Sequence, residues 1–304
     1  MSRRGWALFV AMSVIWGVPY LLIKVAVEEL TPATLVFLRC GLASALLVPW
    51  AVARGQLRPV LRLWRPLLLF TVPEMTGPWL LLAYAEQTLS SSLSGLLVAV
   101  VPIVAGVAGR LAGEQDRLDV VRIAGMALGM VGVAALLGLD IGGGQLVAVG
   151  AVALVVVGYG TAPLIVTRAL HGVPSTGVNA LALSITALVY LPFAGPRLAG
   201  GPVPSGEVML AVVLLALLCT VAALLLFFAL IREVGPNRAL AITFVNPAVA
   251  VLLGIALLGE PLTVGTLVGF PLVLVGCVLA TRRSRPVPAE TADEQVLTEP
   301  VARA

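Results

Sequence analysis

Ten apolar segments of 17 to 24 residues run through this chain of 304 residues and limit the structures it can adopt. A helix needs roughly 17 to 25 mostly apolar residues to cross a bilayer, whereas barrel strands are about half as long and alternate in polarity. With 60% hydrophobic and 11% charged residues, the chain has too little polar surface for a soluble globule. We therefore predict an all-α integral membrane protein with ten transmembrane helices. Their nominal limits are 5–23, 33–53, 66–85, 93–109, 123–139, 145–167, 178–196, 208–231, 239–259 and 261–281.

Basic residues predict how this bundle lies in the membrane. If there are ten spans, the 15 arginines that flank them on one side contrast with the other side, which holds only Arg197 and, at the edge of the first span, Lys24. By the positive-inside rule, both termini are expected in the cytoplasm of a multi-pass protein of the cell (inner) membrane. The basic pI is then a topology signal, and no nucleic-acid partner is expected. The 15 arginines are Arg3, Arg4, Arg54, Arg58, Arg62, Arg65, Arg110, Arg117, Arg122, Arg168, Arg232, Arg238, Arg282, Arg283 and Arg285.

Five short sequence features, which we call marks, occur twice in the same order: an aromatic-glycine pair, a proline, a Gly-Glu pair and two single glycines. Their recurrence indicates an internal duplication. The offsets between the two copies are 143, 145, 146, 144 and 144 residues. Each half contains five spans, and an odd number forces the second half to enter from the opposite face, so the repeats are expected to be inverted. We predict a first repeat at 1–140, a second at 141–281 and a disordered cytosolic tail at 282–304. The marks are Trp16-Gly17, Pro102, Gly113-Glu114, Gly125 and Gly132, matched by Tyr159-Gly160, Pro247, Gly259-Glu260, Gly269 and Gly276.

With these marks the chain resembles an EamA-type member of the drug/metabolite transporter superfamily over residues 5–281. The resemblance rests on Trp16-Gly17 followed by Lys24, on Pro32 and Arg39 opening the second span, on the Pro-to-Gly-Glu runs that end spans 4 and 9, and on the Gly-x6-Gly helices that close each half. It implies a ten-helix bundle around a central cavity lined mainly by spans 1, 3, 4, 6, 8 and 9. It also implies transport of small metabolites, most often outward. Glu86 departs from the family pattern, which would have a leucine there.

Glu74 is the candidate that we weight most strongly. It lies near the middle of the third span, where an ionised carboxylate costs on the order of 3 kcal/mol on insertion scales. Pro73 and Pro78 each remove a backbone donor, so a regular helix is not expected here. Glu74 is expected to face the cavity, where it could carry protons or bind the amine of a substrate. The alternative is a structural ion pair with Arg39 or Lys24.

Arg39 and Lys24 lie near the predicted outer ends of their spans, and each has a structural alternative to a binding role. Arg39 could bind a substrate carboxylate or pair with Glu86, and we favour the structural role. Lys24 could pair with Glu28 one turn further on.

Further cavity candidates are aromatic or neutral polar. Trp16, Trp79, Tyr84 and Tyr159 could form an aromatic wall, although aromatic residues at span ends are more often interface anchors. Thr220, Thr243 and Asn246 add hydrogen-bonding groups in spans 8 and 9, where they could equally join helices to one another. Pro102 and Pro247, together with Pro73 and Pro78, are hinge candidates or static kinks. The Gly-x6-Gly pairs are predicted to be close-packing faces.

These residues favour a secondary transporter over other classes. We predict export of amino acids or related small metabolites, coupled to protons through Glu74; the alternative is a gradient-independent facilitator or channel. No HExxH, paired intramembrane aspartates or P-loop occurs, so no enzyme, metal or cofactor is predicted. Cys40, Cys219 and Cys277 lie inside spans as packing residues. The expected partners are a small-molecule substrate, lipids and protons, and the chain could act as a monomer or homodimer.

Overall fold

A computed structural model describes the chain except residues 114–119, 141–144, 236–238 and 282–304. The predicted tail, Glu114 and five of the topogenic arginines (Arg117, Arg238, Arg282, Arg283 and Arg285) therefore lie outside the described residues.

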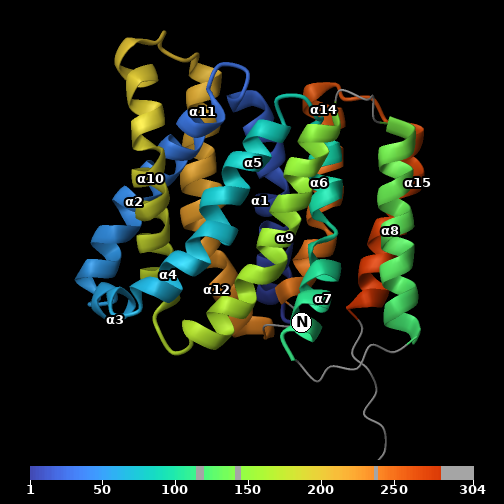
Figure 1. The fold of residues 1–304 in the computed structure, drawn as a ribbon, viewed down its shortest axis with the longest axis horizontal. Helices are drawn as coiled ribbons and strands as arrows, with labels where there is room; N and C mark the ends of the chain where they lie inside the picture. Colours follow the sequence, from blue (N-terminus) through green and yellow to red (C-terminus); the bar gives the residue numbers. More distant parts are fainter. Residues whose placement is uncertain (114–119, 141–144, 236–238, 282–304) are drawn as a thin grey trace, which may run out of the picture.

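Within the described part the fold is entirely helical (Figure 1). The first half contains α1 (Arg3–Ala26), α2 (Pro32–Ala53), α3 (Leu57–Leu61), α4 (Trp64–Thr71), η1 (Val72–Thr76), α5 (Gly77–Ala85), α6 (Ser91–Val98), α7 (Val101–Leu111) and α8 (Val120–Asp140). The second half contains α9 (Leu146–Ala169), α10 (Ser175–Gly200), α11 (Gly206–Ala216), η3 (Leu217–Ala222), α12 (Ala223–Val234), η4 (Leu240–Phe244), α14 (Asn246–Leu258) and α15 (Val264–Ala280).

The apolar segments form the predicted membrane-spanning bundle. Among the described residues, eight helical stretches are long and apolar enough to cross a membrane, and two shorter apolar helices cover 120–136 and 264–280. These ten stretches coincide with the ten predicted segments to within a few residues, so the all-α membrane fold is confirmed. Several of them begin where a Ser or Thr hydroxyl accepts a backbone N–H of the first turn, which satisfies one of the unpaired donors there. The capping residues are Ser2, Thr31, Ser90, Ser205 and Thr263.

Four spans are interrupted, in two repeat-equivalent pairs. Span 4 breaks between α6 and α7, and span 9 breaks between η4 and α14, in each case just before the expected proline, Pro102 or Pro247. Spans 3 and 8 contain the π-helical segments η1 and η3, which lie 145 residues apart in sequence. In η1 the cause is local, because Pro78 has no N–H to donate to the carbonyl of Glu74 four residues earlier. No proline or glycine marks η3, and this interruption was not predicted.

Small residues let the two halves interlock. Gly17 on α1 packs against α14, where an added Cβ would lie 2.5 Å from the Val249 side chain. Its equivalent, Gly160 on α9, packs against α7, where a Cβ would lie 2.8 Å from the Val104 side chain. The first helix of each half therefore contacts the fourth span of the other half. The repeated aromatic-glycine pair thus marks a contact between the halves.

α8 and α15 form a closely packed pair at one side of the bundle (Figure 1). A Cβ on Gly132 would lie 2.9 Å from the Gly269 carbonyl oxygen, and one on Gly125 would lie 2.8 Å from that of Gly276. Side chains at these positions would force the helices apart, which is why both carry glycine at the same spacing. The Gly-x6-Gly pairs are therefore close-packing faces, as expected.

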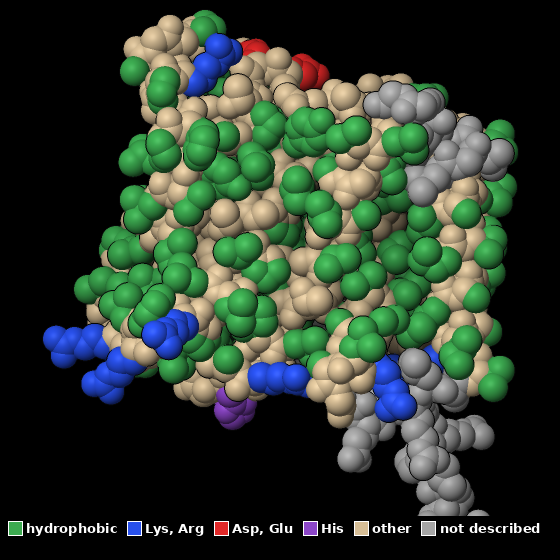
Figure 2. Space-filling view, viewed as in Figure 1, with side chains coloured by type: hydrophobic (Ala, Val, Ile, Leu, Met, Phe, Trp, Pro, Cys, Tyr) green, Lys and Arg blue, Asp and Glu red, His purple; other side chains and the backbone are tan. Residues whose placement is uncertain are grey.

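The bundle has a basic end and an opposite end, which we call the far end. Figure 2 shows most Lys and Arg side chains along the end where α1 begins, acidic side chains beside a basic one at the far end, and an apolar band between the two ends. α1 ends at the far end, where Lys24 Nζ donates to Leu89 O (2.9 Å). α9 begins at that same end, where Gln145 Nε2 donates to Thr88 O (3.2 Å). The first helices of the two halves therefore cross the bundle in opposite directions.

Candidate transport cavity

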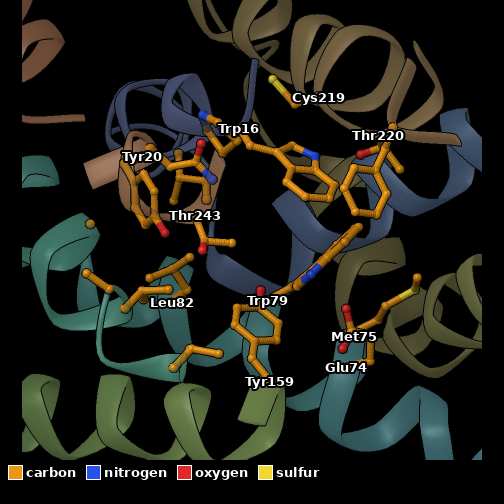
Figure 3. Close-up of a pocket in the computed structure, with 18 of the residues that line it drawn as sticks. Trp16, Tyr20, Glu74, Met75, Trp79, Leu82, Tyr159, Cys219, Thr220 and Thr243 are labelled. Atoms are coloured by element: carbon orange, nitrogen blue, oxygen red, sulfur yellow. The ribbon is translucent and has the colours of Figure 1, made fainter. Parts of the chain in front are cut away.

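A cavity of about 460 Å³ lies at the centre of the bundle, within the usual size range of small-molecule sites. Figure 3 shows its labelled side chains surrounding an open centre, with Glu74 and Met75 on one side and Tyr20 and Thr243 on another. The lining comes from spans 1, 3, 4, 6, 8 and 9, with Arg39 added from α2 and Asn179 from α10. The lining includes Trp16, Tyr20, Ile23, Arg39, Glu74, Trp79, Leu82, Gly95, Pro102, Tyr159, Asn179, Cys219, Thr220, Phe227, Thr243, Asn246 and Pro247.

The structure brings most of the predicted site residues to this cavity, but not all of them. Tyr84 does not line it, and 44% of its surface is exposed on the outside of the bundle. The hinge candidates Pro73 and Pro78 lie behind the lining, where α9 packs against them at Gly158. Lys24 and Glu86 lie beyond the cavity toward the far end. Of the four predicted aromatic residues, Trp16, Trp79 and Tyr159 line the cavity and Tyr84 does not.

Glu74 is carried into the cavity by the π segment η1. Single π turns are rare in proteins and are frequent at functional sites. The segment is held from behind, because Tyr190 Oη donates to the Thr76 carbonyl (2.6 Å) and the Thr76 and Thr186 hydroxyls bond to each other (2.9 Å). Within the described residues the Glu74 carboxylate makes no hydrogen bond or ion pair. The predicted alternative of an ion pair with Arg39 or Lys24 is therefore wrong.

Arg39 is buried, yet its guanidinium reaches the cavity wall. The guanidinium stacks on the Trp79 ring, 3.6 Å from the centroid, and Nε donates to Thr220 Oγ1 (3.1 Å). The predicted pair with Glu86 is absent, because the guanidinium turns instead to Trp79 and Thr220 on the cavity side. Its terminal nitrogens have no hydrogen-bond partner among the described residues. They present a planar, charged fork of the kind that binds carboxylates.

Tyr159 lines the same cavity as Glu74 and Arg39. The Trp79 indole lies beside its hydroxyl (Figure 3). A carboxylate, a phenol and a guanidinium therefore line one cavity. The cavity can therefore offer opposite charges to the two ends of one ligand.

The lining also contains an aromatic pair and an amide group. The rings of Trp16 and Phe227 lie 4.8 Å apart at 41° to each other. Asn246, with its amide oriented to satisfy both groups, donates to Ile242 O (2.8 Å) and Ser13 O (3.1 Å). The bond to Ser13 holds the start of α14 against α1, so Asn246 has a structural contact and also lines the cavity.

Lys24 does not form the predicted pair with Glu28. Its ammonium donates to the carbonyl oxygens of Glu86 (2.7 Å) and Leu89 (2.9 Å), which follow α5. Carbonyls at a helix end lack intrahelical partners, so a partly buried lysine is well placed to satisfy them. Lys24 is thus a structural contact between α1 and the turn after α5.

Three aromatic or amide residues of the lining, Tyr20, Phe227 and Asn179, were missed by sequence reasoning. Tyr20 lies one helical turn after Trp16, so the i, i+4 spacing could have found it. Phe227 and Asn179 carry no comparable signal, because an aromatic residue in an apolar helix and a polar residue near a span end are both common. Among the described residues, no cluster of His, Cys, Asp and Glu could hold a metal ion.

Comparison with known proteins agrees with this architecture. The profile of the EamA-like transporter family matches residues 3–138 and 146–282. YedA, an uncharacterized inner membrane transporter of Escherichia coli K12, is 29% identical over 282 residues, covering 90% of this chain and 89% of that protein; its counterparts in strains O6:H1 and O157:H7 match equally. A protein of known crystal structure shares the fold, with a TM-score of 0.62 and 20% identity over 92% of this chain and 97% of the other. The chain belongs to the EamA-like transporter family.

Proposed function

We propose that this chain is a secondary transporter that exports amino acids or related small metabolites through the central cavity. In this proposal residues 1–140 and 141–281 are two inverted five-helix repeats, and the basic end with both termini is cytosolic. The gathering of arginines at one end supports this orientation. The opposite directions of α1 and α9 support the inversion.

One observation carries the proposed substrate class. Glu74 and Arg39 line the same cavity, and neither is paired with an opposite charge in the described residues. Leaving charges unpaired in a membrane protein is costly, and such residues usually mark a substrate or ion pathway. A zwitterion would offer its carboxylate to Arg39 and its ammonium to Glu74. The apolar rings of Trp16, Trp79 and Tyr159 would then hold its side chain.

Glu74 is also the proposed coupling group. An ionised carboxylate is tolerated where water or an ammonium group reaches it, and a protonated one where neither does. Substrate and proton would therefore compete for the same oxygen atoms. Such competition exchanges one for the other across the membrane.

Proteoliposomes test both parts of the proposal. The purified chain would be reconstituted with a pH gradient, and flux would be followed for a panel of labelled amino acids, amines and carboxylates. We expect zwitterions to be transported in preference to the singly charged analogues. We expect Glu74→Gln to abolish flux driven by the pH gradient, whereas Glu207→Gln, an exposed carboxylate at the far end, leaves it unchanged.

Two outcomes would refute the proposal. Unchanged gradient-driven flux in Glu74→Gln would remove the coupling role. Flux that is indifferent to every gradient in the parent chain would indicate a facilitator instead of a coupled transporter.

A further inference from the structure

A buried polar cluster lies one layer beyond the cavity, toward the far end. Lys24 directly follows the lining residue Ile23, Glu86 lies one turn after the lining residue Leu82, and Ser91 lies one turn before the lining residue Gly95. Each member therefore continues the cavity wall toward the far end. Glu86, Ser91 and Ser94 are fully buried, so the cluster forms a packed layer between the cavity and the far end.

Glu260 ties the two halves together within this cluster. Its carboxylate accepts the backbone N–H groups of Ser91 (2.6 Å) and Ser92 (3.0 Å) and the Ser92 hydroxyl. These N–H groups are the unpaired donors at the start of α6, where a helix binds anions most favourably. Glu260 follows α14, so a carboxylate of the second half caps a helix of the first.

Glu86 differs from Glu260 because nothing caps it. Its side chain is fully buried, and both carboxylate oxygens lack a hydrogen-bond partner among the described residues. The nearby ammonium of Lys24 donates to the Glu86 backbone carbonyl rather than to this carboxylate. The hydroxyls of Ser91 and Ser94, also fully buried, are likewise without partners. The cluster therefore contains groups that are not fully bonded in the closed arrangement.

The surroundings favour the neutral acid. Burying an ionised carboxylate without a partner is unfavourable, whereas the protonated group avoids most of this cost. The titratable groups that face Glu86 are Tyr20 and Lys24 from α1 and Glu260 from the end of α14, whereas α6 presents only serines. Burial raises the pKa of the Glu86 carboxyl well above its ordinary value; Lys24 opposes this change and Glu260 adds to it.

We propose that the Glu86 carboxyl is a proton-binding site that controls the far end of the cavity. With the proton bound, Glu86 is neutral, and Glu260 stays on the N-terminus of α6. When the proton leaves to the solvent at the far end, the ionised carboxylate attracts Lys24 away from the carbonyls of Glu86 and Leu89 and repels Glu260. Both changes loosen the contacts that close this end.

This inference deepens the proposed transport function, since it gives the far end its own proton site, separate from Glu74. It also predicts a pH-dependent opening that needs no substrate. The conformation can therefore be measured without any transport assay. A failure of the proposed substrate or coupling role would leave this prediction standing.

Distance measurement by double electron–electron resonance tests the proposal. The three cysteines, all buried, would be replaced by alanine, and spin labels would be placed at Thr88→Cys and Leu262→Cys, two exposed positions on either side of the Glu260 contact. In nanodiscs without substrate we expect a short distance at low pH. The population with a longer distance should increase with rising pH. While one group titrates, the ratio of the long-distance population to the short-distance population should change by up to about tenfold per pH unit.

Variants decide which group is responsible. Glu86→Gln cannot ionise and is expected to show the short distance at every pH, whereas Glu207→Gln should behave like the parent. A parent chain with no pH response, or Glu86→Gln with an unchanged response, would overturn the proposal. Loss of the response in Glu74→Gln would also overturn it, by assigning the proton to the cavity. If Glu86→Gln does not fold, Glu86→Asp serves instead, and its response must persist with a shifted midpoint.

Discussion

Gly158 lies on α9 directly against the π segment that carries Glu74, so its replacement tests whether this segment is held as the structure shows. A Cβ at this position would collide with the Pro73 carbonyl oxygen and would lie 3.0 Å from Pro78 Cγ. The first of these atoms is backbone and the second belongs to a ring, so neither can rotate away. Gly158→Ala must therefore move η1 or push α9 outward.

The expected cost follows from comparison with a second glycine of the same helix. Inserting one carbon into a packed contact costs about 1 to 3 kcal/mol. Alanine also gains roughly 1 kcal/mol over glycine in a helix, which would hide part of this cost. Gly150 has nothing within 4 Å of an added Cβ, so Gly150→Ala shares the gain without the collision. The difference between the two variants isolates the contact.

We expect Gly158→Ala to unfold more easily than Gly150→Ala by about 1 to 3 kcal/mol, a factor of roughly 5 to 150 in the equilibrium constant. Thermal and denaturant unfolding in detergent would measure it, with circular dichroism as the probe. Transport by Gly158→Ala should fall because Glu74 is displaced. Equal stability and equal transport in the two variants would show that η1 does not pack on α9 in this way.

Three further predictions concern other contacts. Thr220→Val should lower stability by roughly 1 to 3 kcal/mol in the same unfolding assay, because it leaves the buried Arg39 Nε without an acceptor. Gly132→Val should separate α8 from α15 and cause a marked loss of folded protein on size-exclusion chromatography, whereas Gly195→Val, with open space around it, should not. Hydrogen bonds from the side chain and backbone of Ser205 lower the pKa of Glu29. The contribution of Glu29 to stability is therefore complete above the ordinary carboxyl pKa and is lost as pH falls through the lowered value. As pH falls, the stability of Glu29→Gln should therefore decrease less steeply than that of the parent chain. The same decrease in both would contradict a stabilising contact between Glu29 and Ser205.

Several features of the fold could be predicted from the sequence because they have local causes. The length of the apolar segments sets the number of spans, since a helix must be long enough to cross the hydrocarbon. Pro102 and Pro247 predict where spans 4 and 9 break, because proline removes a backbone donor. Pro78 likewise predicts an irregular third span around Glu74.

Other features depend on what each residue meets across the bundle. η3 carries no proline or glycine; in the folded chain the Thr220 hydroxyl donates to Leu215 O (2.8 Å) and accepts from Arg39. Tyr84 and Tyr159 look alike as aromatic residues in spans, but one lies on the exposed surface and the other in the cavity. Helical periodicity places residues on a face, and only packing decides which face is inside.

The sequence by itself determined a duplicated ten-span helical membrane protein and placed an acidic residue in a broken third span. These properties follow from hydropathy and backbone chemistry, which act within a few residues. Only the tertiary structure decided the charge partners. Arg39 contacts Trp79 and Thr220, Lys24 binds two backbone carbonyls, and the Glu86 carboxylate has no hydrogen-bond partner among the described residues. In a low-dielectric bundle the nearest polar groups satisfy a charge, and which groups are nearest is set by how the helices pack.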